Sequence, residues 1–359
     1  MEEIALAIWH EDGRTTTVEN IQTRCQKSSL HRYLEEFQEG AEKGVTRLLT
    51  AFYFRQSGDI KGDKTFEFTH KSFGEYLTAC RIVRMLDRVC KQILLHDDDP
   101  DEGWDERQAL VHWAEICGPT EINFYLDSFI TNQVALAPLD QIQQWQIVVI
   151  RLLESVFFHG MPMEKMGLNN FQEMLRQSCN AEEALLILHT ACAKQTFQVI
   201  QLDLPDEEAF GNWLYYLRGC GHFSFSNALA FLDLEACTLS GQFFWGADFQ
   251  GTDLSRASFS ESELCEAFMN GACLVEAHLR ESNFSFASLR YVNCEGATLV
   301  NANFREADLE GVNFKDADIA GANFEGANLK NTNLHEAMNF ESANLKNTIY
   351  DKSNPSSTD

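Results

Sequence analysis

The stretch ANFREADLEGVNFKDADIAGANFEGANL, from Ala302 to Leu329, repeats one short pattern every five residues. In each repeat an apolar residue is preceded two positions earlier by a small one, and Asp or Asn mostly stands between them. All 21 positions taken in steps of five from Leu234 to Leu334 are apolar. In a chain that is 45% apolar, chance would produce such a run less than about once in a million tries. The C-terminal third of the chain is therefore a repeat.

A period of five fits neither a helix nor a simple alternating strand. It fits a chain that turns a corner after every five residues, with the apolar centre and the small residue pointing inward. Four such sides close a square coil of about 20 residues, and coils stack at the β spacing of about 4.8 Å. The pattern predicts a rod of about five coils. Its predicted core includes Leu254, Phe259, Leu299, Phe304, Leu309, Phe314, Ile319, Phe324 and Leu329.

This region resembles the pentapeptide-repeat family, whose pattern is A(D/N)LXX, over about 110 residues. The resemblance implies a right-handed quadrilateral β-helix, a solenoid that we expect at residues 231–350, before a disordered tail at 351–359. The register slips at Met338–Asn339 and recovers from Phe340 onward. Because a stack of coils has open β edges, both ends need a cover. Ile349 and Tyr350 are candidates at the C-terminal end, and the helical region is the candidate at the other end.

The region from residue 1 to residue 230 is predicted to be mostly α-helical with one β feature, which makes the whole chain α+β and multidomain. We expect a first domain at residues 1–100 and a helical domain at 101–230. Asn180 and Glu183 stand at the spacing of a capping box, which predicts a helix start there. The stretch before His70 predicts two short strands around a Gly/Asp turn, followed by a helix. This order of elements, two helices followed by a hairpin and a third helix, is typical of a winged-helix fold.

The motif FEFTHKSFGEYL, from Phe66 to Leu77, places one histidine among four aromatic residues. It resembles the end of the winged-helix region in NACHT-type STAND NTPases, and the resemblance extends over about residues 1–135. It implies that His70 contacts ADP when an upstream NTPase domain is present. The alternative is a histidine at a helix start, hydrogen-bonded within the wing. The family's phosphate loop is expected upstream, so we interpret the chain as a fragment of a larger NTPase or the product of a split gene.

The nearest match to a phosphate loop runs from Gly58 to Thr65, with Asp63 where the second glycine belongs. A carboxylate there would repel phosphate, and the segment fits a hairpin turn better. The run from His96 to Glu102 collects carboxylates but lacks the glycine and the distal glutamate of a calcium loop. No nucleophile, base and orienting group form a recognisable set. We therefore expect no enzymatic activity, no metal and no cofactor bound by this chain alone.

The net charge of −26 argues against binding to nucleic acid or to an anionic membrane. The eleven cysteines form no CxxC pair and fall within apolar runs, as in proteins of a reducing compartment. The sequence has no secretory signal, and no apolar run approaches the length of a membrane span, about 18 residues. These features predict a cytoplasmic protein with protein partners, including an NTPase domain in cis or in trans.

Two functional classes fit the sequence. The first is a non-catalytic sensor and scaffold segment of a STAND NTPase in bacterial defence or signalling, with the rod recognising a protein partner. The second is an acidic DNA mimic that binds a type II topoisomerase. Residues 231–359 hold 20 acidic and 8 basic residues, so their net negative charge per residue is only moderately higher than that of positions 1–230. We favour the first class, because the helical half would serve no purpose in a mimic.

Two aromatic residues and two cysteines occupy outward positions of the rod. Phe243 and Trp245 are expected to form a docking surface for the helices, with ligand contact as the alternative. Cys265 and Cys273 also face outward, but no basic residue nearby would activate either thiol.

Overall fold

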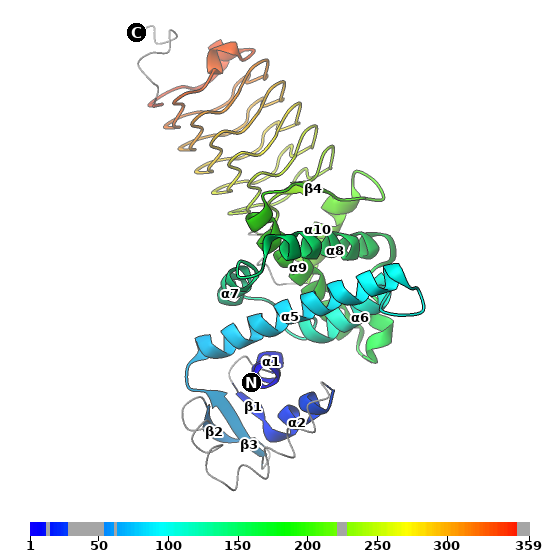
Figure 1. Ribbon diagram of the computed structural model, residues 1–359. Helices are drawn as coiled ribbons and strands as arrows, with labels where there is room; N and C mark the ends of the chain where they lie inside the picture. Colours follow the sequence, from blue (N-terminus) through cyan, green and yellow to red (C-terminus); the bar gives the residue numbers. More distant parts are fainter. Residues whose placement is uncertain (12–14, 28–53, 61–62, 221–227, 350–359) are drawn as a thin grey trace. The chain divides into compact units, whose positions relative to one another are not determined.

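The computed structural model describes residues 1–11, 15–27, 54–60, 63–220 and 228–349 (Figure 1). The chain forms two compact units. The first unit joins Met1–Gln141 to Met161–Ala184, and the second joins Ile142–Gly160 to the chain from Leu185 onward. These units do not follow the boundaries that we expected at residues 100 and 230. Three helical segments that precede the repeat belong wholly or in part to the second unit.

The first unit contains a small sheet and several helices. Its elements are α1 (Glu2–His10), β1 (Thr15–Thr17), α2 (Val18–Lys27), β2 (Phe54–Ile60), β3 (Asp63–Phe68), α5 (Lys71–Asp98), α6 (Glu106–Cys117), α7 (Phe124–Val134), the 3₁₀ turn η1 (Met163–Met166) and the first half of α9 (Phe171–Thr196). The strands lie in the order β1-β3-β2, and both pairs are antiparallel. Strands β2 and β3 lie where the hairpin was predicted. Its identity as the wing of a winged helix stays a prediction.

Helix α5 supplies the longest apolar face of the first unit. Apolar side chains recur at helical spacing along it and are buried, among them Ala79, Ile82, Leu86, Val89 and Ile93. At its start, Phe68 packs against Ala5 and Ile8 of α1 and meets Phe73 edge to face, with ring centroids 5.6 Å apart. The expectation that Phe68 fills a core is therefore confirmed, whereas Phe73 is only partly buried.

The expected helix start at Asn180 is wrong. Asn180 lies inside α9, and its side-chain amide donates a hydrogen bond of 2.7 Å to the carbonyl of Gly118. Nearby, the indole of Trp113 donates to the carbonyl of Ala181 at 2.9 Å. The polar side chain that suggested a cap is used instead to join α9 to the end of α6, a tertiary contact that local spacing does not reveal.

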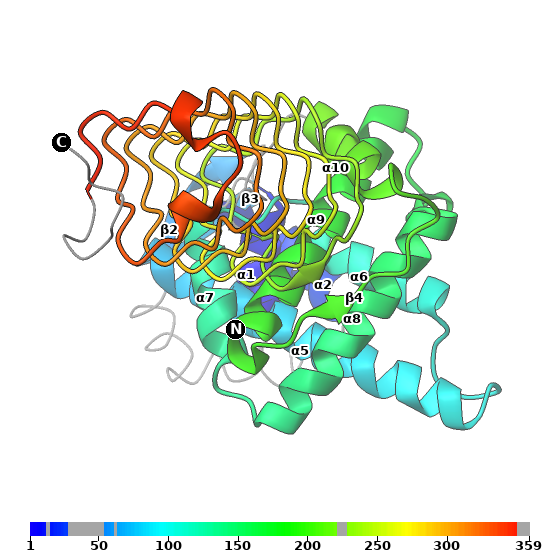
Figure 2. The same cartoon turned by 90° about the horizontal axis from the view of Figure 1, so that it is seen from above.

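The second unit contains α8 (Leu139–His159) from Ile142 onward, the second half of α9, β4 (Ile200–Gln201), α10 (Ala209–Gly219), β5 (Leu232–Asp233) and the rod. In the rod, each coil pairs in parallel with the next, beginning with Asp233–Asp253. Figures 1 and 2 show these coils as successive loops stacked side by side. Every apolar centre from Leu234 to Leu334 is at most 1% exposed. The predicted coil length and repeat core are thus confirmed.

The register slip is also confirmed. Up to Asp318–Met338, paired positions keep the interval of the first pair, Asp233–Asp253. In the two later pairs, Asn323–Asn344 and Asn328–Ile349, the partners stand one position further apart. The extra residue falls near two 3₁₀ turns, η3 (Leu334–Glu336) and η4 (Phe340–Ser342). Ile349 closes the last described pair and is 50% exposed, while Tyr350 lies outside the described residues.

Helical segments cover the first coil within the second unit. Strand β4 extends the parallel stack by pairing Ile200 with Leu232. The carbonyl of Gly211 in α10 accepts a hydrogen bond of 3.1 Å from the side chain of Gln242. A methyl group on Gly211 would lie 2.2 Å from the carbonyl oxygen of Thr238, so α10 meets the first coil by its backbone. The expected N-terminal cap is therefore present.

Candidate interaction surface

The corners of the rod have left-handed backbone. Every fifth residue from Ala236 to Asn331 has a φ between +56° and +74°, whether it is glycine, asparagine, glutamate or an aromatic residue. Each corner is a β-turn, as shown by the hydrogen bond of 3.1 Å from the amide of Ala257 to the carbonyl of Leu254. Its third residue, here Arg256, occupies the position at which a type II turn requires positive φ. This position was missed in the sequence, because only some of the corners carry glycine.

Side chains at the corners lean toward the next coil. A methyl group on Gly311 would lie 2.6 Å from Cδ1 of Tyr291, which stands one coil earlier at the same corner. Phe231 and Gly251 show the same relationship. At these two corners the glycine of the next coil leaves room for the ring of the coil before it, and the ring of Tyr291 lies over the backbone of Gly311.

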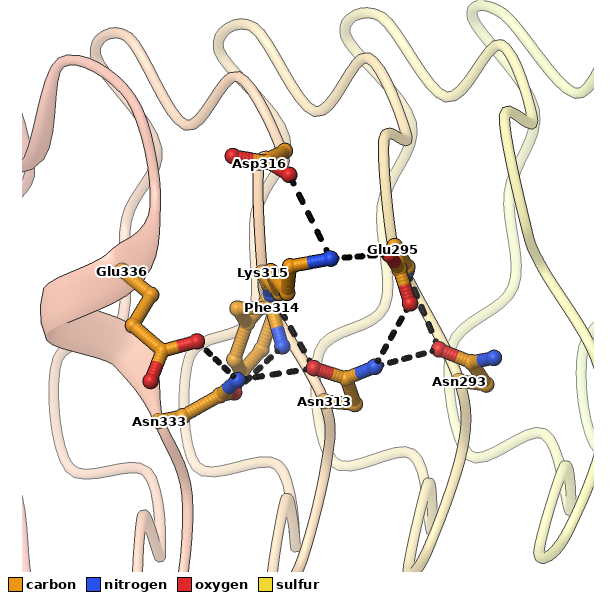
Figure 3. A network of polar contacts seen from close by, with 8 residues as sticks. All are labelled: Asn293, Glu295, Asn313, Phe314, Lys315, Asp316, Asn333 and Glu336. Atoms are coloured by element: carbon orange, nitrogen blue, oxygen red, sulfur yellow. Dashed lines mark hydrogen bonds and ion pairs between the residues drawn. The ribbon is translucent and has the colours of Figure 1, made fainter.

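Asparagine ladders run along the outside of the rod. The amide of Asn313 donates to Oδ1 of Asn293, and the amide of Asn333 donates to Oδ1 of Asn313, both at 2.8 Å (Figure 3). Oδ1 of Asn313 also accepts the backbone N–H of Lys315 at 3.1 Å, and Oδ1 of Asn293 accepts that of Glu295 at 3.2 Å. These amides are satisfied on both sides, so they hold the register of neighbouring coils and leave little capacity for a ligand.

Several charged side chains on the rod form ion pairs with one another. Lys315 contacts Glu295 at 2.6 Å and Asp316 at 3.7 Å (Figure 3), and Arg290 contacts Glu310 at 2.8 Å. The hydrogen bond from Lys315 lowers the pKa of Glu295 and raises the pKa of Lys315. Further ion pairs join Arg256 to Glu235 and Lys346 to Glu325. These pairs lie on several sides of the rod and neutralise part of its negative charge.

Exposed aromatic side chains gather in the first half of the rod. We call this set the rod aromatic surface: Phe243 (70% exposed), Trp245 (68%), Phe268 (52%), Phe286 (57%) and Tyr291 (62%). The pairing register places them on two neighbouring sides of the square coil. Phe286 stands at the corner where these two sides meet. From residue 292 to residue 337, all of which are described, no large apolar side chain is exposed.

The expected role of Phe243 and Trp245 needs a correction. Both side chains point outward as predicted, but the helices of their own unit leave them largely exposed. The helix α10 reaches this coil by other contacts: the guanidinium of Arg218 donates to the carbonyl of Phe243 and lies 5.0 Å from the ring centre of Phe244. Contacts with the backbone and with an inward ring thus replace the expected docking of the two outward rings.

The two outward cysteines carry no sign of reactivity. Burial and the neighbouring carboxylate of Glu263 raise the pKa of the Cys265 thiol. The thiol of Cys273 lies 3.1 Å from the hydroxyl of Ser255. In the part of the chain that the structure describes, no group of three or more His, Cys, Asp or Glu side chains is arranged to hold a metal ion.

His70 lies exposed at the start of α5, where it occupies the N-cap position without a side-chain capping bond. The phosphate-loop look-alike divides between β2 and β3, and residues 61 and 62 lie outside the described residues. The nucleotide contact implied for His70 therefore stays a prediction. The described helices include none with the length and apolar content that crossing a membrane requires.

Comparisons with known proteins agree with the architecture of the rod. The family model described as pentapeptide repeats, in eight copies, matches residues 233–271, 246–280, 277–316 and 313–349. Among curated proteins there is no significant match to this chain. The resemblance of the segment 1–135 to NACHT-type NTPases finds no support in these comparisons.

Three solved structures illustrate the match. A pentapeptide repeat protein from the thylakoid lumen of Arabidopsis thaliana is 33% identical over 25% of this chain and 70% of its own, with a TM-score of 0.18. The pentapeptide repeat protein Rfr23 of the cyanobacterium Cyanothece 51142 is 25% identical over 40% of this chain and 96% of its own, with a TM-score of 0.15. The plasmid-mediated fluoroquinolone resistance protein QnrB1 is 18% identical over 33% of this chain and 81% of its own, with a TM-score of 0.19.

Proposed function

From the premise that residues 233–349 are pentapeptide repeats, we propose that this chain is a non-catalytic scaffold whose rod recognises a protein partner. The observation that carries the proposal is the rod aromatic surface, Phe243, Trp245, Phe268, Phe286 and Tyr291. Aromatic side chains are enriched at protein interfaces and supply much of the binding energy there. Here they stand on a rod whose coils are held by backbone pairing and asparagine ladders, so little conformational entropy is lost on binding.

A second part of the proposal gives a role to the first unit. We propose that it links the rod to an NTPase domain, in cis or in trans, as the motif from Phe66 to Leu77 suggests. In this arrangement a partner bound to the rod alters the NTPase, and the chain itself performs no chemistry.

The distribution of charge favours recognition of a protein over mimicry of DNA. A mimic needs a continuous row of unpaired carboxylates, whereas Glu295, Glu310 and Asp308 are paired with Lys315 or Arg290. The exposed aromatic side chains are a distinctive outward feature of the first half of the rod. We accordingly place the topoisomerase-binding alternative second.

The test compares two triple variants of the full chain. The aromatic variant removes the centre of the rod aromatic surface and carries Trp245→Ser, Phe268→Ser and Phe286→Ser. Ser260→Ala, Thr298→Ala and Val300→Ala form the control on another side of the same coils. We expect both proteins to melt within a few degrees of the unchanged chain, since all six positions point outward.

Each protein is used to capture partners from a lysate of its source cells, with quantitative mass spectrometry as the readout. We expect one or a few proteins to be retained by the unchanged chain and the control, and lost with the aromatic variant. Equal capture by all three chains would refute the role of the aromatic surface. Inhibition of a type II topoisomerase by the unchanged chain would instead favour the DNA-mimic alternative.

A further inference from the structure

Three carboxylates cross one side of the rod within the coil of residues 253–272. Glu261 and Glu266 stand at the two corners of this side, both with left-handed backbone, and their side chains are exposed. Glu263 stands between them and is half-buried. We call Glu261, Glu263 and Glu266 the acidic row. It runs across the rod and not along it, because all three residues belong to one coil.

Members of the rod aromatic surface lie on both sides of the acidic row. Phe243 pairs with Glu263 in the stack, so its exposed ring stands one coil before the row. Phe286 occupies the same corner as Glu266 one coil later and is also exposed. Neighbouring coils are separated by about 4.8 Å, so a group that contacts the row is within reach of either ring.

The acidic row has no cation of its own. The ion pairs among the described residues of the rod all involve other carboxylates. Within the row, Oε2 of Glu263 accepts the side-chain amide of Asn283 at 2.7 Å, and this donor is neutral. The negative charge of the row is therefore not neutralised by the rod, and Glu261 and Glu266 present theirs to solvent.

A guanidinium group suits both the rings and the carboxylates of this surface. It is planar and weakly hydrated, so it stacks on aromatic rings, and it donates paired hydrogen bonds to a carboxylate. An ammonium is a compact, strongly hydrated charge and gains less from the rings. A second copy of this chain is a poor occupant, because its net charge of −26 repels the row. The same repulsion disfavours nucleic acid.

We propose that the acidic row and the rings beside it bind an arginine-bearing segment of the protein partner. This inference rests on the proposed function, since it assigns a chemistry to the partner of the rod aromatic surface. Guanidinium groups of the partner stack on the exposed rings and donate to the acidic row. The rings supply affinity, and the row selects a positively charged segment over a neutral or acidic one.

The test is fluorescence anisotropy on the full chain with three short labelled peptides. Arginine alternates with glycine in the first peptide. Lysine replaces arginine in the second, and citrulline, which keeps the shape of arginine without its charge, replaces it in the third. Titrations are run at about 0.15 M salt, because the net charge of −26 attracts any cationic peptide at low ionic strength. We expect saturable binding of the arginine peptide, at least about threefold weaker binding of the lysine peptide, and none of the citrulline peptide.

Matched variants of the chain locate the site. Glu261→Gln with Glu266→Gln removes two charges of the acidic row and is expected to weaken binding of the arginine peptide about fivefold. Glu276→Gln with Glu341→Gln removes the same charge from exposed positions elsewhere on the rod and should change binding by less than about twofold. The aromatic variant keeps the row and is expected to weaken binding at least about fivefold. Melting curves check that each variant is folded.

The proposal is overturned if the arginine peptide shows no saturable binding, or if the lysine or citrulline peptide binds equally well. Equal weakening by the two glutamine variants, or full binding by the aromatic variant, would also overturn it, since only general attraction of charge would then remain. If the arginine peptide does not bind but the aromatic variant still loses its lysate partner, the proposed function stands and this inference alone fails.

Discussion

The rings of Phe284 and Phe304 lie parallel inside the rod, with centroids 5.0 Å apart and 5° between their planes. Phe324 continues the stack at 5.1 Å. Isolated aromatic pairs favour offset or edge-to-face contacts. The spacing of the coils, about 4.8 Å in a β stack, therefore sets this arrangement, and the rings fill the interior that the coils enclose.

Phe304→Asp is expected to abolish the folded rod. The substitution buries an unpaired carboxylate between two rings, at a cost of several kcal/mol against a total stability of similar size. Circular dichroism and urea unfolding of the full chain measure the loss. The neighbouring Arg305 is exposed, so Arg305→Asp serves as the control and should change the free energy of unfolding by less than about 1 kcal/mol. A folded rod in the Phe304→Asp variant would contradict the square-coil core.

Gly311→Ala should destabilise the rod more than Gly241→Ala. Both glycines have left-handed φ, +74° and +66°, so each alanine carries backbone strain of about 1–2 kcal/mol. Only Gly311 has a ring against it, at 2.6 Å from Tyr291. The difference in urea midpoints measures the clash, and Tyr291→Ala should remove that difference in a double-mutant cycle. Equal effects at the two glycines would show that the ring moves aside freely.

His189 should make stability depend on pH. The imidazole is fully buried in α9, neither nitrogen is hydrogen-bonded to a described residue, and burial lowers its pKa to about 4 despite the opposing effect of the backbone of Ala230 and Phe231. Below the unfolded pKa of about 6.5 the unfolded chain binds a proton that the folded chain does not. Stability is therefore present above pH 6.5 and is lost as the pH falls toward 4.

The expected loss from this group between pH 7 and pH 5 is roughly 2 kcal/mol. Other groups titrate in the same range, so the measurement is the difference in pH dependence between the unchanged chain and His189→Leu. The variant should unfold with a shallower pH dependence over this interval. Parallel curves for the two chains would mean that His189 accepts a proton in the folded state without penalty.

Phe68 and His70 should differ sharply in their effect on stability. Phe68→Ala empties a site that is 6% exposed and should cost about 3–5 kcal/mol. His70 is exposed, so His70→Ala should cost no more than about 1 kcal/mol. Phe73→Ala should fall between them, because its ring is only partly buried. Melting curves of the three variants give the order, and a large effect of His70→Ala would make that histidine a structural residue.

The full chain is expected to neither bind nor hydrolyse ATP or GTP. Asp63 stands where a phosphate loop needs glycine, and a carboxylate at that position repels phosphate. Calorimetry with each nucleotide and a phosphate-release assay test the expectation. One-to-one binding at micromolar affinity that His70→Ala abolishes would place a nucleotide site in this chain and overturn the interpretation of a missing NTPase domain.

The sequence by itself determined the rod. Its period of five, the small residues before each centre and the slip after Met338 are local patterns, and each apolar centre is buried as the pattern predicts. The sequence also located Phe68 in a core and the strands β2 and β3, since turn residues and alternation act over short distances.

Only the tertiary structure decided the rest. A glutamate such as Glu261 adopts left-handed φ because pairing with the next coil imposes it, not because of its own preference. Asn180 matches a helix cap by its spacing, yet its amide is bound by the carbonyl of Gly118, far earlier in the chain. A cavity of about 590 Å³ beside Glu75 is likewise assembled from three stretches of the chain, residues 5–11, 67–78 and 120–126. Contacts between residues far apart in the chain set these features, and no short-range pattern carries that information.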